Sequence, residues 1–435
     1  MSKYSVTLLS LISMLMTTEQ PGFAQNQKHT DNLRNPAAVQ EANFRDRLTS
    51  DDCHWAWEQL EIEQAQEIIY AAKKEHPGDG ISIAHIDTGI VPFPALQRNS
   101  DSGLYSAGLL WGPKINSFMG IMNFVQPHLP AIDNNPKAPN FGHGTETASL
   151  IVGSLPETNV PGWGFKGVAP WARLLPIKVT DSVVMVGNIS TGGTADLRNL
   201  AEGIRLATKL GAQVMTISLG AVFDQKNFIK IAVNEALEQG IIVVAAAGQT
   251  LPIDIVPLPA NLPGVISVTA STRPLGHWQE AFSGKNISWA APGEDVCHFG
   301  IDRNARNPPR LSQLQQVSQI LSRNGAEMTL QGIVRRSSGT SYSTAFSAGA
   351  AALWLQHHNS SALAKLYGKK NISKLFMAVA REMAMETPPG WNTDKHGAGI
   401  LNIRKLLEAP LPCRSVDTSE NCAVKLSAFL SSASR

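Results

Sequence analysis

Short apolar segments alternate with amphipathic ones through the middle of this chain of 435 residues. The apolar runs are six or seven residues long, which is typical of buried strands. They cover 81–86, 174–179, 214–219, 241–247 and 265–270. Apolar strands separated by amphipathic helices indicate βαβ units. We therefore expect an α/β fold with a mostly parallel central sheet and helices on both of its faces.

The segments between these runs predict the helices. Apolar residues recur at helical spacing over 57–72, 197–207 and around 231–237. Each segment is followed by residues that typically end a helix: Pro77-Gly78, Gly211 and Gly240. Further helices are expected at 147–152, 344–356 and 373–385.

The N-terminal segment, residues 1–24, has the layout of a secretory signal peptide. Lys3 precedes an apolar stretch over 6–16, and residues 22–24 (Gly-Phe-Ala) offer a small-x-small cleavage site. The alternative is the apolar N-terminus of a cytoplasmic protein. We expect an exported protein, secreted or periplasmic. Neither this stretch nor any later one is long enough to cross a bilayer, so no membrane span is expected.

The rest of the chain is expected to hold one folded domain, at 51–409, between two flanking segments. Residues 25–50 are polar and lack periodicity, which predicts a flexible lead-in. A polar stretch at about 294–337 interrupts the domain and is expected to be a surface insertion, on which a partner protein could dock. The tail at 410–435 is Ser-rich.

Composition excludes some classes of partner. Lys and Arg total 37 against 35 Asp and Glu, and no long run of like charge occurs. A nucleic-acid partner would require a basic face or cluster, so none is expected. The four cysteines lack the spacing of metal sites. Cys413 and Cys422 could close a small loop in an exported protein, and four free thiols are the alternative.

Three short segments carry an aspartate, a histidine and a serine among small residues. They are Asp87-Thr88-Gly89, His143-Gly144-Thr145 and Gly339-Thr340-Ser341. A serine hydroxyl is a poor nucleophile until an imidazole accepts its proton, and the imidazole needs a carboxylate that fixes its tautomer and stabilises its cation. Ser341 also precedes a predicted helix, whose N-terminus favours a developing oxyanion. The three segments together predict nucleophilic catalysis by serine.

Each segment alone has a simpler explanation. A lone histidine is more often structural, and a Thr or Ser before a helix is more often an N-cap. Asp-Thr-Gly also occurs in aspartic peptidases, where two copies share a proton, but this chain has one copy, which leaves only a dimeric version. The chain lacks the Gly-x-Ser-x-Gly of esterases and the His-Glu-x-x-His of many metalloenzymes.

From about residue 54 to 403 the chain resembles the subtilase family of serine peptidases. The three catalytic blocks match in order, and further non-catalytic blocks match with them. The matching blocks are 83–90, 142–153, 167–170 with 178–179, 218–220, 291–293 and 339–349. The resemblance implies a subtilisin-like fold for the domain and a polypeptide substrate.

The resemblance also implies residue roles. Ser341 would attack the peptide carbonyl, His143 would act as base and then as acid, and Asp87 would orient His143. The substrate backbone would pair with Ser218-Leu219-Gly220 as an added strand. Ala246-Ala247-Gly248 would form the opposite wall of the primary specificity pocket.

Gln249 is the clearest departure from the family, whose oxyanion asparagine normally follows Ala-Gly. Glutamine keeps the amide donor but is one methylene longer, so we expect Gln249 and the backbone N–H of Ser341 to form a slower oxyanion site. The complete triad favours a serine endopeptidase acting through an acyl-enzyme. The alternative is a catalytically impaired peptide-binding or scaffold protein. Glu146 and Ala345 also stand where the family often has histidine and proline.

No cofactor is expected from the catalytic residues. Family members often bind calcium, and Asp133-Asn134-Asn135 are the candidate ligands here, although no ligand pattern along the chain establishes a site.

Overall fold

The computed structural model describes residues 48–91, 123–125, 131–135, 137–155, 158–185, 195–222, 224, 226–249, 255–301, 332–413 and 419–433. The chain divides into residues 1–49 and 50–435, and only the second unit is described below. The predicted signal peptide and nearly all of the predicted lead-in lie outside the described residues. Within the described part, no helix has the length and apolar character that a bilayer crossing requires.

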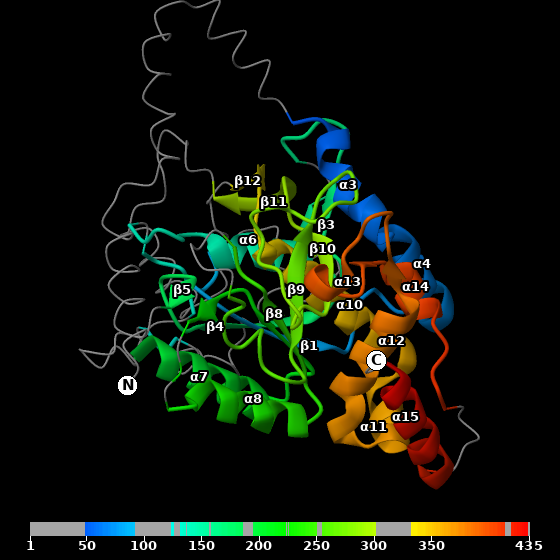
Figure 1. Cartoon of the computed structure of the whole chain (residues 1–435). Coiled ribbons are helices and arrows are strands. Elements are labelled where there is room, and N and C mark those ends of the chain that lie inside the picture. The colour runs from blue at the N-terminus through cyan, green and yellow to red at the C-terminus, as the bar shows by residue number, and fades with distance from the viewer. Residues whose placement is uncertain are drawn as a thin grey trace, which may run out of the picture. The chain divides into compact units, whose positions relative to one another are not determined.

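An eight-stranded sheet forms the centre of this unit (Figure 1). Its strands run in the order β13-β14-β10-β9-β8-β6-β1-β4. All neighbouring pairs are parallel except β13 with β14. The strands are β1 Ser82–Asp87, β4 Arg173–Lys178, β6 Val214–Ile217, β8 Ile242–Ala246, β9 Ile266–Ser271, β10 Trp289–Pro292, β13 Met385–Glu386 and β14 Ile400–Leu401. The expected mostly parallel sheet is confirmed.

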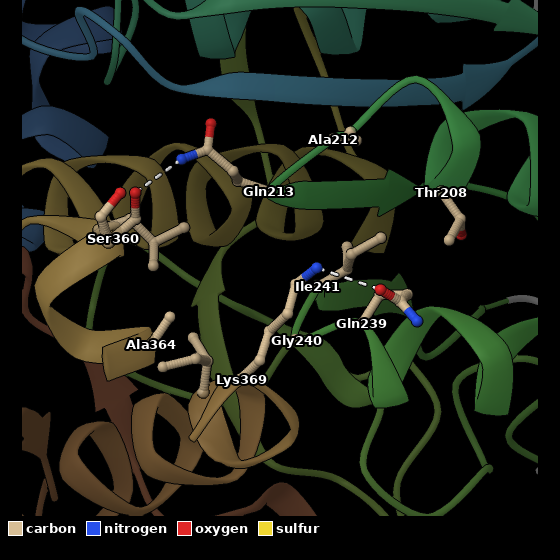
Figure 2. A pocket seen from close by; sticks show the side chains of 13 residues that line it. Thr208, Ala212, Gln213, Gln239, Gly240, Ile241, Ser360, Ala364 and Lys369 are labelled. Atoms are coloured by element: carbon tan, nitrogen blue, oxygen red, sulfur yellow. Dashed lines mark hydrogen bonds between the residues drawn. The ribbon is translucent and has the colours of Figure 1, made fainter. Parts of the chain in front are cut away.

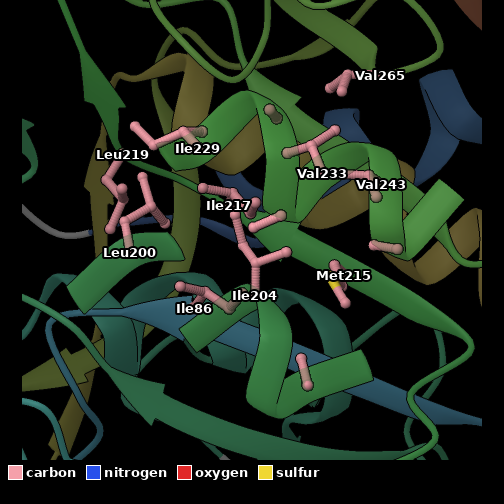
Figure 3. Close-up of a cluster of buried hydrophobic side chains, with 14 of the residues drawn as sticks. Ile86, Leu200, Ile204, Met215, Ile217, Leu219, Ile229, Val233, Val243 and Val265 are labelled. Atoms are coloured by element: carbon pink, nitrogen blue, oxygen red, sulfur yellow. The ribbon is translucent and has the colours of Figure 1, made fainter. Parts of the chain in front are cut away.

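Helices cover both faces of the sheet. Successive side chains of a strand point to opposite faces, so neighbouring residues of β1 contact different helices. Ile86 of β1 belongs to a buried apolar cluster that the sheet forms with helices α7 (Ala195–Lys209) and α8 (Phe228–Glu238) (Figure 3). The neighbouring residue, His85, contacts Thr147 on the opposite side, in helix α6.

Helices α6 (His143–Val152) and α10 (Thr340–His358) pack against each other on that second face. Helix α10 also contacts β6, β8 and β9, and its side chains are buried from Thr340 through Gln356. Its sequence of alanine, glycine and serine suits this burial, because small side chains let the helix approach the sheet closely.

The remaining elements surround this layered core. The other helices are α3 Ser50–Leu60, α4 Ile62–Lys73, α11 Ser360–Tyr367, α12 Ile372–Met383, α13 Thr393–His396, α14 Ile403–Glu408 and α15 Ser419–Ala433, with a 3-10 turn at Lys369–Asn371. Three pairs of short strands are β2 Ser154–Leu155 with β3 Phe165–Lys166, β5 Val184–Met185 with β7 Gly220–Ala221, and β11 Val296–Ile301 with β12 Gly332–Ser337.

The ends of the expected surface insertion form an antiparallel hairpin, β11–β12. All six residues of β11 are buried, which differs from the expected surface position. The physical reason is that β11 packs against α6, where the N–H of Phe299 donates to the hydroxyl of Ser149 at 3.1 Å. Residues 302–331 lie outside the described part.

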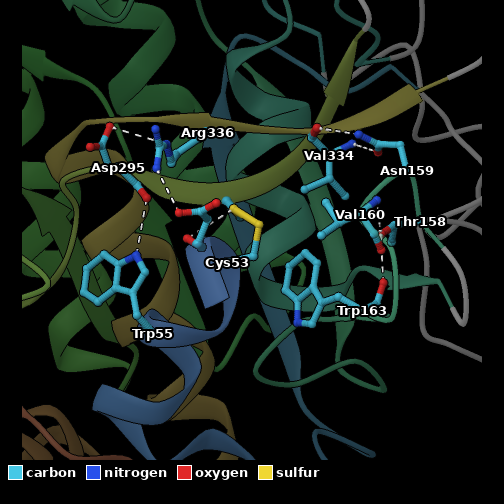
Figure 4. Close-up of a disulfide and its surroundings, with 11 residues drawn as sticks. Cys53, Trp55, Thr158, Asn159, Val160, Trp163, Asp295, Val334 and Arg336 are labelled. Carbon is cyan, nitrogen blue, oxygen red and sulfur yellow. Dashed lines mark hydrogen bonds and ion pairs between the residues drawn. A yellow bond between two sulfur atoms is a disulfide. The ribbon is translucent and has the colours of Figure 1, made fainter. Parts of the chain in front are cut away.

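Two disulfides join distant or terminal segments. Cys53 of α3 is bonded to Cys297 of β11, a pairing that the sequence did not predict (Figure 4). Cys413 is bonded to Cys422 of α15, so the disulfide rather than the free-thiol alternative holds there.

Three helix boundaries in the described part differ clearly from the expectations, and one of them is the start of α6 at His143 rather than at 147. The helix expected over 57–72 is divided into α3 and α4 at Glu61, whose backbone is left-handed with φ 52° and ψ 47°. Helix α10 begins at Thr340 rather than at 344, with Gly339 as its N-cap. Ser341 therefore lies in the first turn of α10 and not before it.

Candidate active site

Asp87, His143 and Ser341 converge at one edge of the sheet, although 56 and 198 residues separate the successive pairs along the chain. His143 Nδ1 lies 2.8 Å from Asp87 Oδ1, and His143 Nε2 lies 2.9 Å from Ser341 Oγ. Nδ1 carries the proton that the carboxylate accepts, so Nε2 is left to accept the proton of the serine hydroxyl. This is the geometry that nucleophilic catalysis by serine requires.

The three side chains come from the ends of three elements. Asp87 is the last residue of β1, His143 is the first residue of α6, and Ser341 is the second residue of α10. Gly144 lets α6 start against the loop after β1, because a methyl group in its place would overlap the carbonyl oxygen of Gly89. The small residues around the triad thus allow close approach of backbone.

Electrostatics bind the aspartate and the histidine together. Burial alone would lower the pKa of His143, but the charge and hydrogen bond of Asp87 outweigh burial and raise it, with smaller contributions from Glu146 and Asp133. Burial alone would raise the pKa of Asp87, but the charge and hydrogen bond of His143 lower it. Asp87 therefore remains a carboxylate that stabilises the imidazolium.

Ser341 is held close to a second acceptor. Its Oγ lies 3.2 Å from the carbonyl oxygen of Ser218, and the hydroxyl of Ser218 donates to the carbonyl oxygen of Ser341 at 3.2 Å. The side chain of His143 is 13% exposed and that of Asp87 is 1% exposed, so the triad is reached from solvent at the serine and histidine end.

A model described as the subtilase family matches residues 78–401, which include all three of these side chains. The chain belongs to the subtilase family. The chain spans half or less of the length of several curated relatives. It covers 31% of the minor extracellular protease Epr of Bacillus subtilis (strain 168), 49% of a thermostable alkaline protease of Halalkalibacterium halodurans and 21% of fervidolysin of Fervidobacterium pennivorans.

Two curated relatives of this subtilase match over more than half of the chain. Epr is 29% identical over 249 residues, or 57% of this chain. Mycosin-1 of Mycolicibacterium smegmatis is 24% identical over 414 residues, which are 87% of this chain and 76% of mycosin-1. The crystal structure of MycP1 with its N-terminal propeptide removed has 25% identity and a TM-score of 0.54, and the match covers 83% of this chain and 98% of MycP1.

Gln249 of this subtilase contacts the start of α10 through its amide oxygen. Oε1 accepts hydrogen bonds from the backbone N–H and the hydroxyl of Thr340, both at 2.8 Å. The amide nitrogen lies on the side of Gly339, where an added methyl group would be 3.2 Å from Nε2. The hydrogen bonds to Oε1 therefore set the orientation of the amide. They leave Nε2, the donor, beside the first turn of α10, which contains Ser341.

The two expected substrate segments follow β6 and β8. Within Ser218-Leu219-Gly220, the N–H of Gly220 donates to the carbonyl of Val183 at 3.0 Å. This N–H is therefore already hydrogen-bonded within the chain. Within Ala246-Ala247-Gly248, the N–H of Gly248 donates to the hydroxyl of Thr340 at 3.2 Å. The structure thus brings both segments to the start of α10.

Pro257 lies against both segments. A methyl group on Gly220 would be 2.7 Å from Cγ of Pro257, and one on Gly248 would be 3.3 Å from its Cδ. The proline is buried. Its ring therefore fills space between the two expected walls of the specificity pocket, which no motif in the sequence predicts.

The structure adds residues beside the triad that the sequence analysis did not assign to the site. Glu146, one turn after His143 in α6, contacts Arg335 of β12 and Tyr342, which follows Ser341. From the sequence, Glu146 is only a departure from the family. Its partner in β12 is 189 residues away, so only the fold reveals the pair.

The candidate calcium ligands are engaged by the protein. Asp133 Oδ2 accepts from the hydroxyl of Thr88 at 3.0 Å and from the N–H of Gly142 at 2.7 Å, and Asp133 Oδ1 lies 3.9 Å from the ammonium of Lys178. Burial raises the pKa of Asp133 to about 6 in spite of Lys178. These surroundings, with a buried lysine beside the carboxylate, do not fit a calcium site. Among the described residues, no group of three His, Cys, Asp or Glu side chains could hold a metal ion.

A separate pocket of about 240 Å³ lies at the opposite edge of the sheet (Figure 2). Two of its lining residues, Gln213 and Ile241, directly precede β6 and β8, whereas the triad lies beyond the carboxyl ends of the parallel strands. The side chains of Gln213 and Ser360 are hydrogen-bonded at 3.0 Å, as are those of Lys369 and Gln239 at 3.1 Å. Ligands of parallel sheets usually bind at the carboxyl ends of the strands. The functional site is therefore expected at the triad and not at this pocket.

Proposed function

We propose that this subtilase is a serine endopeptidase that hydrolyses peptide bonds through an acyl-enzyme. The observation that carries the proposal is the pair of contacts on one imidazole, 2.8 Å to Asp87 and 2.9 Å to Ser341. The proposed substrate is a polypeptide whose backbone lies along Ser218-Leu219-Gly220, opposite Ala246-Ala247-Gly248.

In the proposed reaction, Ser341 Oγ attacks the carbonyl carbon of the scissile bond while its proton passes to His143 Nε2. The resulting oxyanion accepts hydrogen bonds from the backbone N–H of Ser341 and from Gln249 Nε2. When the tetrahedral intermediate collapses, His143 gives the proton to the leaving amine and an ester to Ser341 remains. A water molecule that transfers a proton to His143 then hydrolyses this ester and regenerates the serine.

Export is part of the proposal. The N-terminal sequence has the layout of a signal peptide, and a relative, Epr, is named an extracellular protease. The two disulfides support an oxidising compartment, because such bonds rarely persist in a reducing cytoplasm.

Cleavage of a mixed peptide library tests the activity. We expect the purified protein to cleave internal bonds, Ser341→Ala to be inactive, and the matched variant Ser361→Ala, an exposed serine in α11, to cleave like the wild type. Folded protein that binds library peptides without cleaving any of them would instead establish the impaired peptide-binding alternative.

A further inference from the structure

Glu146 is a buried carboxylate, and each of its two oxygens accepts a hydrogen bond. Only 5% of the residue is exposed. Arg335 Nη2 donates to Oε1 at 2.6 Å, and the hydroxyl of Tyr342 donates to Oε2 at 3.0 Å. The backbone of β11 covers the stem of the side chain, because a methyl group on Gly300 would lie 3.0 Å from Glu146 Cγ. A charge buried this deeply requires such partners.

The contact between Glu146 and Tyr342 joins the two helices that carry the base and the nucleophile. Glu146 lies in the first turn of α6, which starts at His143, and Tyr342 lies in the first turn of α10, directly after Ser341. A shift of α6 against α10 would therefore change this contact and the distance from His143 Nε2 to Ser341 Oγ together.

The β11–β12 hairpin supplies the rest of the cluster. Arg335 comes from β12, and His298 of β11 stacks on the ring of Tyr342 with centroids 4.9 Å apart. His298 Nε2 also lies 3.9 Å from Glu146 Oε2. The disulfide of Cys297, next to His298, ties this hairpin to α3.

The charged and titratable groups around His143 come from every element that packs near it. Burial alone would raise the pKa of Glu146, but His298, Arg335 and His143 lower it, together with the hydrogen bond of Tyr342. Burial lowers the pKa of His298 to about 4 and that of His85 to about 4, so both are neutral near pH 7. The groups that act on His143 or on its neighbours are Asp87 and His85 of β1, Asp133, Glu146 of α6, Lys178 of β4, Asp181, His298 of β11, Arg335 of β12 and Tyr342 of α10.

We propose that Glu146 is a positioning residue for the triad, which holds the helix of His143 to the helix of Ser341 and makes both depend on the β11–β12 hairpin. This inference rests on the proposed peptidase function. Two effects follow from it. The contact with Tyr342 fixes the distance between base and nucleophile, and the negative charge stabilises the imidazolium that forms during the reaction.

Two conservative variants separate these effects. Glu146→Gln keeps the shape and an acceptor for Tyr342 but removes the charge, whereas Tyr342→Phe removes only the hydroxyl. The matched control is Arg404→Met, which removes the ion pair with Glu61 at the junction of α3 and α4. Circular dichroism verifies that each variant is folded. For each variant, kcat and KM are measured across pH on a peptide that the wild type cleaves.

We expect Glu146→Gln to lower kcat by about ten-fold or more with KM within about two-fold, and to move the acid limb of the profile to lower pH. Tyr342→Phe should lower kcat with a smaller movement of the limb, and Arg404→Met should match the wild type. A folded Glu146→Gln variant with wild-type kcat and an unmoved limb overturns the proposal. If Glu146→Gln does not fold, wild-type kcat in Tyr342→Phe overturns it.

A titration of His143 tests the role of Glu146 without relying on peptidase activity. The imidazole resonances of ¹³C-histidine-labelled protein are followed across pH by NMR, with the His143 resonance assigned from His143→Gln. A wild type that cleaves no peptide contradicts the peptidase function, yet the titration still reports on Glu146. We expect a lower pKa for His143 in Glu146→Gln, and an unchanged pKa overturns the coupling.

Discussion

Gln249 and Thr340 are joined by two hydrogen bonds, in which the amide oxygen of Gln249 accepts from the N–H and the hydroxyl of Thr340, both at 2.8 Å. Thr340 directly precedes Ser341, so these bonds fix the amide relative to the nucleophile. The extra methylene of glutamine is thereby accommodated, since its oxygen reaches the helix start while its nitrogen stays beside Gly339.

This contact leads to a prediction for position 249. From the sequence alone, Gln249→Asn is expected to be faster if the glutamine is a poor donor, because asparagine is the family's usual donor. The contact with Thr340 reverses that expectation, since the shorter side chain loses its anchor. We expect Gln249→Asn to be no faster than the wild type and Gln249→Ala to lose about 100-fold in kcat with little change in KM, the lower end of the loss seen when such a donor is removed from a subtilisin. Steady-state kinetics decide, and a faster asparagine variant contradicts the anchored arrangement.

The pH dependence follows from the raised pKa of His143. The reaction needs neutral His143 as base, so the rate falls as the pH drops through this pKa. We expect the acid limb of kcat/KM to lie above pH 6.5, the ordinary value for histidine, because Asp87 stabilises the imidazolium. Asp87→Asn should lower kcat by about 10⁴ and move the limb to lower pH. A wild-type limb below pH 6.5 would show that Asp87 does not act on His143 in this way.

The disulfide of Cys53 and Cys297 should contribute more to stability than that of Cys413 and Cys422. The first spans 244 residues and the second spans 9. The chain-entropy model gives about 5.5 kcal/mol for the long loop and about 2.5 kcal/mol for the short one. Urea unfolding of the two Cys→Ser double variants measures the difference in free energy of unfolding. Equal losses, or a larger loss for the short loop, would be inconsistent with this account.

Pro257 should restrict the residue on the acyl side of the scissile bond. Its buried ring lies against Gly220 and Gly248, the two expected walls of the pocket. We expect the wild type to prefer small side chains such as alanine at that position. Pro257→Gly should extend cleavage to leucine and phenylalanine, raising their kcat/KM by about ten-fold relative to alanine, since a few buried methylenes are worth that much. Library sequencing by mass spectrometry reads the preference, and a wild type that already favours phenylalanine refutes the restriction.

The sequence predicts the parallel sheet from local patterns, and it predicts the convergence of the triad from the resemblance of three segments to the subtilase family. Apolar runs such as 214–219 are buried whatever surrounds them, and the glycines beside Asp87 and His143 mark close approach of backbone. The start of α10 is harder to predict, because the hydroxyls of Thr340, Ser341 and Ser343 usually favour caps over helix interiors. Their burial against β10 and other neighbours overrides that preference, as the contact of the Ser343 hydroxyl with the Ala291 carbonyl illustrates.

The rest of the site depends on contacts between segments that no local pattern connects. The ion pair of Glu146 with Arg335 joins α6 to β12, and predicting it requires knowing that the β11–β12 hairpin packs against α6. The disulfide of Cys53 required knowing that β11 is buried beside α3. The break at Glu61 depends on a left-handed backbone conformation. The side chain of Glu61 is paired with Arg404 of α14, more than three hundred residues later.

The most direct test of the account is the reaction of Ser341 with a fluorophosphonate, because only a serine activated by a neighbouring base reacts readily. Folded protein is treated near pH 8, digested, and the modified residue is identified by mass spectrometry. We predict a single stoichiometric adduct on Ser341, abolished in His143→Ala and retained in Ser361→Ala. A folded wild type that stays unlabelled, or an adduct that persists at Ser341 without His143, would contradict the proposed triad.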